Sequence, residues 1–336
     1  MAGSAKSALV FQGGGALGAY ELGAARALYS DHNFSPDLIA GVSIGAVTAA
    51  LLARPKKPLT PLEALEAFWK KVTISAPFLP PPVRSYAAFL GNPHFFMPRQ
   101  DYVNFFGWTY FYDIEPLRRT LGELVDCDAL ANKAALPRLL VSATDLGQGQ
   151  IKYFYSADCN LSLDHIIASG SLPPAFPAAE IDHAYYWDGG LFDNTPLGAV
   201  LDHLSDARDV DRTVYVVNLF PNQAKIPATM AEIAARMKNL QFANKSLEDI
   251  ELLRRFNKVA ALIAAIEALP GGNPLEGKAA YEDVKAENYL HVPRVISITP
   301  PDVPDEYGDA DFSPEAIEQR AEAGKKQTLK ALEGAV

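Results

Sequence analysis

Residues 9–20 read LVFQGGGALGAY, and residues 38–50 read LIAGVSIGAVTAA. In each stretch, a short apolar run with the composition of a buried strand passes through glycines into a run with helical spacing. Two such strand-to-helix units in succession are typical of an α/β protein with a parallel sheet.

The same alternation continues along the chain. Strand-like runs recur as RLLVSATDL at residues 138–146, TVYVVNLF at 213–220 and RVISITP at 294–300, with helical patterns between them. The run LIAGV at residues 38–42 is almost wholly apolar, as expected for a strand that is covered on both faces. We therefore expect a doubly wound α/β fold with helices on both faces of the sheet.

Composition and charge narrow the possible partners. The chain has 336 residues, of which 49% are hydrophobic, so it can bury a large core as one α/β domain or two smaller ones. Its net charge of −10, without a local run of Lys or Arg, argues against nucleic acid as a partner. The two cysteines, Cys127 and Cys159, lack the spacing of a zinc site, and we expect two buried, reduced thiols.

No targeting or membrane-spanning segment is visible in the sequence. Residues 1–11 lack the apolar run and cleavage site of a signal peptide. The apolar helical pattern VAALIAAIEALP, at residues 259–270, is about half of the roughly 20 residues that span a bilayer. We expect a soluble, cytoplasmic protein.

Three further segments carry recognisable patterns. Residues 83–112 are unusually aromatic, and their rings suit core packing, a lid or a lipid-binding surface. Residues 229–270 predict a helix packed on the sheet, not one lying on a membrane, because acids offset its basic residues. Helices are also predicted after Thr60, which precedes Pro61 at the first helical position, and after Ser313, a cap with Glu315 and Glu318 near the helix start.

The glycine cluster GGGALG, at residues 13–18, fits G-x-G-x-x-G. A dinucleotide fold would also need an acidic residue at the tip of the second strand, but residues 41–43 read Gly-Val-Ser. A P-loop would close with G-K-[ST], whereas Ala19 follows the cluster. Two interpretations remain: a tight turn, or a turn whose N–H groups stabilise a developing negative charge as an oxyanion hole.

The pentapeptide GVSIG, at residues 41–45, fits the nucleophile elbow G-x-S-x-G and makes Ser43 a candidate nucleophile. An α/β-hydrolase would need several strands before the elbow and a catalytic histidine after it. Only one strand precedes Ser43, and no histidine stands in a loop typical of a base. The six histidines are His32, His94, His165, His183, His203 and His291.

Asp188 is a candidate base. It lies in YYWDGGL, at residues 185–191, where Gly189 and Gly190 allow a tight turn. Alone, an Asp-Gly pair predicts an ordinary hairpin turn. Its occurrence with the glycine cluster and the elbow serine, all at strand ends, favours a catalytic role. Trp187, Phe192 and the segment 86–112 are expected to shield its carboxylate from water and raise its pKa.

Together these motifs resemble those of the patatin-like phospholipases, in a bacterial cytoplasmic branch of that family. The segments ASGSLPPAFP, at 168–177, and NTP, at 194–196, extend the resemblance. It implies a three-layer α/β/α fold with a mainly parallel central sheet and a helical C-terminal region. The implied site consists of the nucleophile Ser43, the base Asp188, the oxyanion donors Gly13, Gly14 and Gly15, and the supporting glycines Gly18, Gly41, Gly45, Gly189 and Gly190.

The resemblance also implies an activity. We expect a serine acyl hydrolase that cleaves carboxylic esters of lipids through a Ser-Asp dyad and an acyl-enzyme, without metal or cofactor, and with transient contact to a membrane surface. Residues 5–225 would form the catalytic core, with a lid-like segment at about 83–112. Residues 226–336 would add helices and one strand, packed on the same domain.

Two other functions stay open at this point: a catalytically silent lipid-binding or regulatory protein of the same fold, and a nucleotide-binding module that rests on the glycine cluster alone. One residue departs from the family pattern. Many members carry Arg or Lys where this chain has Leu17. The change removes a cation beside the glycine cluster, and with it the reason to expect a preference for anionic head groups.

Overall fold

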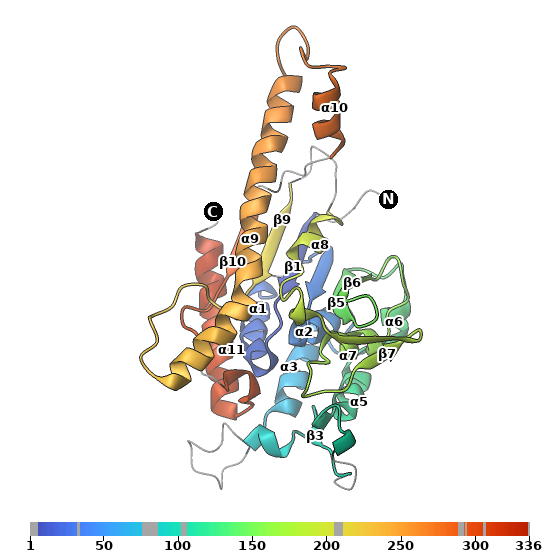
Figure 1. Ribbon diagram of the computed structural model, residues 1–336, viewed down its shortest axis with the longest axis vertical. Coiled ribbons are helices and arrows are strands. Elements are labelled where there is room, and N and C mark those ends of the chain that lie inside the picture. Colours follow the sequence, from blue (N-terminus) through green and yellow to red (C-terminus); the bar gives the residue numbers. More distant parts are fainter. Residues whose placement is uncertain are drawn as a thin grey trace.

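The computed structural model describes residues 6–31, 34–75, 87–101, 106–204, 211–287, 292, 294–304 and 307–334. Within these residues, eight strands form one sheet in the order β10-β9-β1-β2-β5-β8-β7, with β6 paired to β5 (Figure 1). The strands are β1 Ser7–Phe11, β2 Leu38–Gly41, β5 Arg138–Asp145, β6 Gln150–Tyr155, β7 Ala179–Ile181, β8 Ala184–Asp188, β9 Thr213–Val217 and β10 Arg294–Ile298. A separate two-stranded hairpin consists of β3 Met97–Pro98 and β4 Tyr112–Asp113.

The central strands run parallel, as predicted. β10, β9, β1, β2 and β5 pair with their neighbours in parallel, whereas β6, β8 and β7 are antiparallel additions at one side. The carboxyl ends of β1 and β2 therefore meet at one edge of the sheet, where ligands bind in open α/β folds.

Helices cover both faces of the sheet, which confirms the three-layer α/β/α architecture. On one face, side chains such as Leu9 and Ile39 pack in a cluster with the larger set of helices. On the other face, Val10 and Ala40 pack with α8 and part of α9. The first set comprises α1 Ala19–Leu28, α2 Ile44–Ala53, α3 Pro61–Val72, α5 Glu115–Leu124, α7 Leu163–Ser169 and α11 Pro314–Glu333; the second comprises α8 Leu197–Leu201 and α9 Met230–Glu267.

The predicted helix starts are confirmed by their caps. Thr60 and Glu63 form a capping box at the start of α3, with Pro61 as the first helical residue. The Ser313 side chain accepts a hydrogen bond from the backbone N–H of Ala316 at the start of α11. Such caps satisfy backbone donors that have no partner within the helix.

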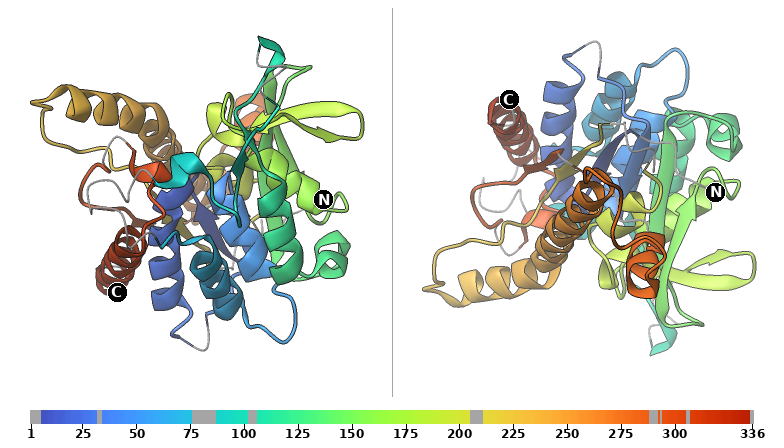
Figure 2. Two further views of the ribbon diagram at one scale, coloured as in Figure 1. Left: turned by 90° about the horizontal axis from the view of Figure 1, so that it is seen from below. Right: turned by 90° about the horizontal axis from the view of Figure 1, so that it is seen from above.

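Helices α1 and α11 lie side by side, so close that their backbones are in contact (Figure 2). A Cβ atom on Gly23 of α1 would lie 1.8 Å from the carbonyl oxygen of Ala321, and one on Gly324 of α11 would lie 2.0 Å from that of Tyr20. Neither glycine can be replaced without moving a helix. Helix α11 is therefore an integral support of α1, the helix that follows the glycine cluster.

Helix α9 differs in part from its predicted packing. It is 38 residues long, and its distal end extends beyond the sheet beside α10, Ala279–Ala286 (Figure 1). Leu253 is buried, but Leu252 and Leu262 are exposed. The predicted packing is confirmed for the parts of α9 around Ala243 and Leu253, which belong to the two core clusters. No helix in the described part of the chain is both long and apolar enough to cross a membrane.

The predicted burial of the cysteines is wrong. Cys127 is exposed because it begins α6, Cys127–Ala131, which lies at the surface, and Cys159 is partly exposed in the turn after β6.

Candidate active site

Ser43 stands at the junction between β2 and α2, with φ 55° and ψ −123°. A positive φ is strained for a serine and is characteristic of a nucleophile elbow. The flanking glycines make room for the turn: a Cβ atom on Gly41 would lie 2.1 Å from the carbonyl oxygen of Gly45, and one on Gly45 would lie 2.6 Å from that of Phe11. The local motif thus has the expected conformation.

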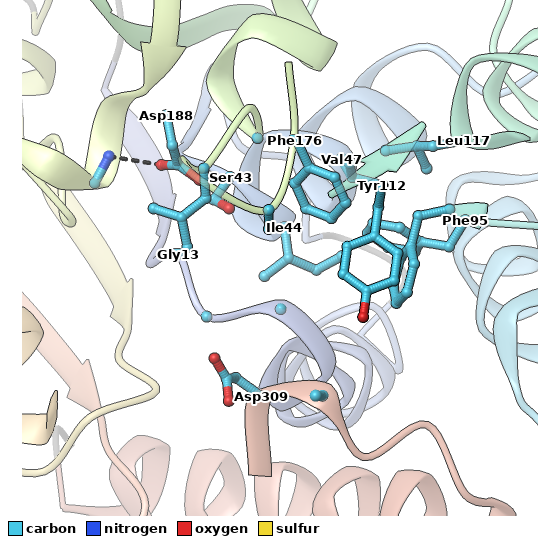
Figure 3. Close-up of a pocket in the computed structure, with 18 of the residues that line it drawn as sticks. Gly13, Ser43, Ile44, Val47, Phe95, Tyr112, Leu117, Phe176, Asp188 and Asp309 are labelled. Carbon is cyan, nitrogen blue, oxygen red and sulfur yellow. Dashed lines mark hydrogen bonds between the residues drawn. The ribbon is translucent and has the colours of Figure 1, made fainter. Parts of the chain in front are cut away.

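Asp188 reaches the same place from the antiparallel side of the sheet. Asp188 of β8 pairs with Ala143 of β5, two residues beyond Val141, which pairs with Gly41 of β2. This register brings Asp188 level with Ser43. The Ser43 side chain lies beside the Asp188 carboxylate and, as a hydrogen-bonding group, lowers its pKa. The N–H of Gly190 donates a hydrogen bond to the same carboxylate at 2.7 Å (Figure 3).

The Asp188 carboxyl group is almost fully buried, with an exposed fraction of 3%. Burial raises its pKa to about 6, although the hydrogen bonds from Ser43 and Gly190 act in the opposite direction. The sequence predicts that Phe192 shields the Asp188 carboxylate from water, but it does not. Its ring is exposed, because it follows the turn and faces solvent. Apolar residues from other segments, including Ile166 and Leu172, line the space around the dyad.

The glycine cluster passes beside Ser43, but its three predicted donors are not equivalent. The N–H of Gly13 donates to the carbonyl oxygen of Asn194 at 3.3 Å, and the Asn194 amide donates back to the Gly13 carbonyl at 3.1 Å. No described residue accepts a hydrogen bond from the N–H of Gly14 or Gly15. The predicted donor Gly13 is thus already engaged, and Gly14 and Gly15 have N–H groups available for an oxyanion.

The end of α7 positions both members of the dyad. The backbone N–H of Ser43 donates to the Ser169 hydroxyl at 3.0 Å. The N–H of Asp188 donates to the carbonyl oxygen of Ser171, also at 3.0 Å. The segment 168–177 therefore fixes two residues that lie far apart in the sequence. Its composition alone carries no signal for these contacts.

A cavity of about 230 Å³ opens onto the dyad. Its walls are mainly apolar, and several of its rings contact one another, with Phe95, Phe96 and Phe312 at centroid separations of 5.4 to 6.3 Å. Around Ser43 and Asp188, the lining includes Ile44, Val47, Phe89, Phe95, Phe96, Tyr112, Leu117, Phe176, Phe220, Phe242 and Phe312.

A family model described as patatin-like phospholipase matches residues 9–201. The chain belongs to the patatin-like phospholipase family. The matched segment runs from within β1 to the end of α8 and includes Ser43 and Asp188, and membership indicates lipid hydrolase function in general terms.

Among solved structures, this patatin-like protein is similar to VipD from Legionella pneumophila. The two are 16% identical, the TM-score is 0.44, and the alignment covers 99% of this chain and 67% of that one. Among curated proteins, no sequence matches the chain.

In the aromatic segment of this patatin-like protein, some rings line the cavity and others lie on the protein surface. Phe95 and Phe96 are buried in the cavity wall, whereas Phe106 is fully exposed. Residues 83–86 and 102–105 of the predicted lid lie outside the described residues.

Gln12 is a buried residue that sequence reasoning missed. Its side-chain amide donates to the Thr195 hydroxyl at 2.8 Å. Its carbonyl oxygen accepts from the N–H groups of Leu219 and Phe220 at 2.7 and 3.0 Å. Gln12 thereby ties the end of β1 to two other segments around the cavity, and only its place before the glycine cluster could have drawn attention to it.

The described histidines have other surroundings, and none lines the cavity. His165 accepts a hydrogen bond from Ser162 at the start of α7, and His203 stacks on Tyr155. His183 is exposed in the turn between β7 and β8, and His94 lies outside the lining. His32 and His291 lie outside the described residues. Within the described chain, no group of His, Cys, Asp and Glu is arranged to hold a metal ion.

Proposed function

We propose that the protein is a serine acyl hydrolase that cleaves carboxylic ester bonds of lipids through a Ser-Asp dyad. One observation carries the proposal: Ser43, strained at φ 55°, lies beside the buried Asp188 carboxylate where an apolar cavity opens. A strained serine beside a buried base is the arrangement that activates a nucleophile. The apolar walls suit an acyl chain.

In the first half-reaction, Ser43 Oγ attacks the ester carbonyl while Asp188 accepts its proton. A carboxylate with a pKa of about 6 is a stronger base than an ordinary one, yet it is ionised at neutral pH. The N–H groups of Gly14 and Gly15 donate to the oxyanion. The N–H of Ile44, the residue after the nucleophile, has the usual place of a further donor.

In the second half-reaction, the acyl-enzyme is hydrolysed. The alcohol leaves with the proton held by Asp188, and a water molecule then attacks the acyl carbonyl as Asp188 accepts one of its protons. The fatty acid departs and Ser43 regains its hydrogen. During both steps the acyl chain lies among apolar side chains such as Phe96 and Leu117.

The first turns of α9 support transient contact with a lipid surface. Met230, Ile233, Met237 and Leu240 are exposed and share one face of the helix, at spacings of three and four residues. The same part of α9 contributes Phe242 to the cavity lining. An apolar row beside the cavity suits a protein that takes its substrate from a membrane.

Hydrolysis of p-nitrophenyl esters of increasing acyl length tests the proposed activity. We expect turnover of medium-chain esters, because the cavity walls are apolar, and release of fatty acid from phospholipid vesicles in a parallel assay. A well-folded protein without turnover in either assay would instead be a silent lipid-binding protein of this fold.

We expect activity to depend on the protonation of Asp188. Because the carboxyl must be ionised to accept the Ser43 proton, kcat should be half-maximal near pH 6 and fall about tenfold for each further pH unit below it. The measurement is kcat on a soluble short-chain ester between pH 4.5 and pH 8. A profile that is flat over this range contradicts the assignment of the base.

Replacement of Gly189 by valine should lower kcat by about two orders of magnitude or more. A Cβ atom there would lie 2.6 Å from the carbonyl oxygen of Ser142 and 2.8 Å from the Val42 side chain, so the turn that holds Asp188 must move. The matched control is Gly198→Val, where a Cβ atom meets nothing within 4 Å. Equal losses in the two variants, with both folded, contradict the positional argument.

A further inference from the structure

One pair of opposite charges lines the cavity away from the dyad. Lys238 of α9 and Asp309 of η5, Gly308–Ala310, lie with Nζ and Oδ1 2.6 Å apart and with side chains 34% and 28% exposed. Apart from Asp188, these are the charged residues among the described lining. A partly buried ion pair is costly to desolvate, so its presence in an apolar wall calls for an explanation.

The pair lies across the glycine cluster from Ser43. A Cβ atom on Gly13 would lie 3.0 Å from the Ser43 Cβ, and one on Gly15 would lie 2.4 Å from the Asp309 carbonyl oxygen. Two peptide units, about 7 Å at most, separate the Cα atoms of Gly13 and Gly15. The charges are therefore a short distance beyond the oxyanion donors.

Two directions lead away from Ser43 in the cavity (Figure 3). Phe95, Tyr112 and Leu117 lie on one side, where the lining is apolar, whereas Asp309 lies on another, below the glycine cluster. An ester whose carbonyl sits at Gly14 and Gly15 can place its acyl chain among the rings and its alcohol portion toward the charges.

We propose that Lys238 and Asp309 form the head-group subsite of this enzyme and select a phospholipid with a zwitterionic head group. The Lys238 ammonium contacts the phosphate, and the Asp309 carboxylate contacts the head-group ammonium. The inference rests on the proposed lipid esterase function. A net-neutral pair of charges complements a net-neutral, dipolar ligand, whereas an anionic head group would leave Asp309 facing a like charge.

The proposed subsite also compensates for the cation that is missing at Leu17. The sequence predicts that a cation beside the glycine cluster is lost, but α9 supplies one to the cavity in Lys238. Lys238 lies beyond residues 9–201, so comparison of the family motifs alone cannot find it. A cation alone would favour anionic lipid, but because Asp309 accompanies Lys238, the expected preference is for zwitterionic lipid.

The test compares three soluble esters with the same octanoyl chain: a lysophosphatidylcholine, a lysophosphatidylglycerol and a monoacylglycerol. In the wild type, kcat/KM should be highest for the lysophosphatidylcholine. The head-group ratio is kcat/KM for the lysophosphatidylcholine divided by kcat/KM for the monoacylglycerol. Lys238→Met should lower this ratio about tenfold or more, since a hydrogen bond to a charged group is lost. Asp309→Asn should reduce the preference for lysophosphatidylcholine over lysophosphatidylglycerol.

Two further variants separate recognition from structural support. Lys238→Arg keeps the cation and should restore the ratio. Lys285→Met removes a matched ion pair that joins α10 to the distal end of α9, Lys285 with Glu267 at 2.8 Å, and should leave the ratio as in the wild type. If thermal unfolding shows that Lys238→Met is poorly folded, Asp309→Asn provides the test instead.

A uniform fall for all three esters in both Lys238→Met and Asp309→Asn would overturn the subsite and make the pair a structural tie between α9 and η5. Absence of turnover of any of these esters in the wild type would instead overturn the proposed function itself. The two failures are therefore distinguishable.

Discussion

Replacement of Ser43 by alanine is expected to abolish ester hydrolysis while leaving the fold intact. In the proposed mechanism the hydroxyl is the nucleophile, and loss of the nucleophile in a serine hydrolase lowers kcat by about six orders of magnitude. Alanine keeps the Cβ atom, and the N–H of residue 43 can still donate to the Ser169 hydroxyl. The elbow should therefore form as before.

A fluorophosphonate probe provides the measurement. It should label the wild type and leave Ser43→Ala unlabelled, with thermal unfolding showing that both proteins are folded. Ser30→Ala, in the turn after α1, is the matched control and should label as the wild type does. Labelling of another serine in the Ser43 variant contradicts the assignment of the nucleophile.

Replacement of Asp188 by asparagine should lower kcat by several orders of magnitude. The amide has the shape of the carboxyl group, and its oxygen can still accept the hydrogen bond from Gly190. It cannot accept a proton from Ser43. The measurement is kcat on the short-chain ester together with the rate of fluorophosphonate labelling, which should fall in parallel because Ser43 is no longer activated.

The histidines are the controls for this prediction. Single alanine variants of all six should keep most of the activity, since none of the described ones lines the cavity. One folded His→Ala variant as inactive as Ser43→Ala would replace the dyad with a Ser-His-Asp triad.

The features that the sequence predicts correctly are local ones. Strand, turn and helix follow one another within a few residues around Ser43, so apolar runs and the spacing of Gly41 and Gly45 suffice to predict the elbow. The same holds for the helix starts at Thr60 and Ser313, whose caps involve only the next three residues.

The features that escape prediction depend on distant segments. The motif predicts Asp188 as the partner of Ser43, but not how it gets there: β8 runs antiparallel to β5, and no local pattern encodes that register. Likewise, the N–H of Gly13 is engaged by Asn194, 181 residues away along the chain, so identical-looking glycines differ as donors. Sequence spacing identifies the cluster but does not distinguish its members.

The C-terminal region is hard to predict for a related reason. An amphipathic pattern says that a helix has an apolar face, but not what covers it. On α9, part of that face is exposed at Met230 and Met237, whereas Lys238, which follows Met237, lines the cavity. The balance of acids and bases along the helix could not reveal this division.

The close crossing of α1 and α11 limits how the protein can be dissected. A recombinant fragment that stops at residue 201, where the family match ends, would lack β9, the parallel partner of β1, and would leave the groove at Gly23 open to water. It would also lose Arg320 of α11, which donates a hydrogen bond at 3.2 Å to the carbonyl oxygen of Ala16, within the glycine cluster. The smallest portion of this chain able to hold its catalytic loop in shape therefore extends through α11, and gene truncations or exchanges with relatives should keep that helix together with α1.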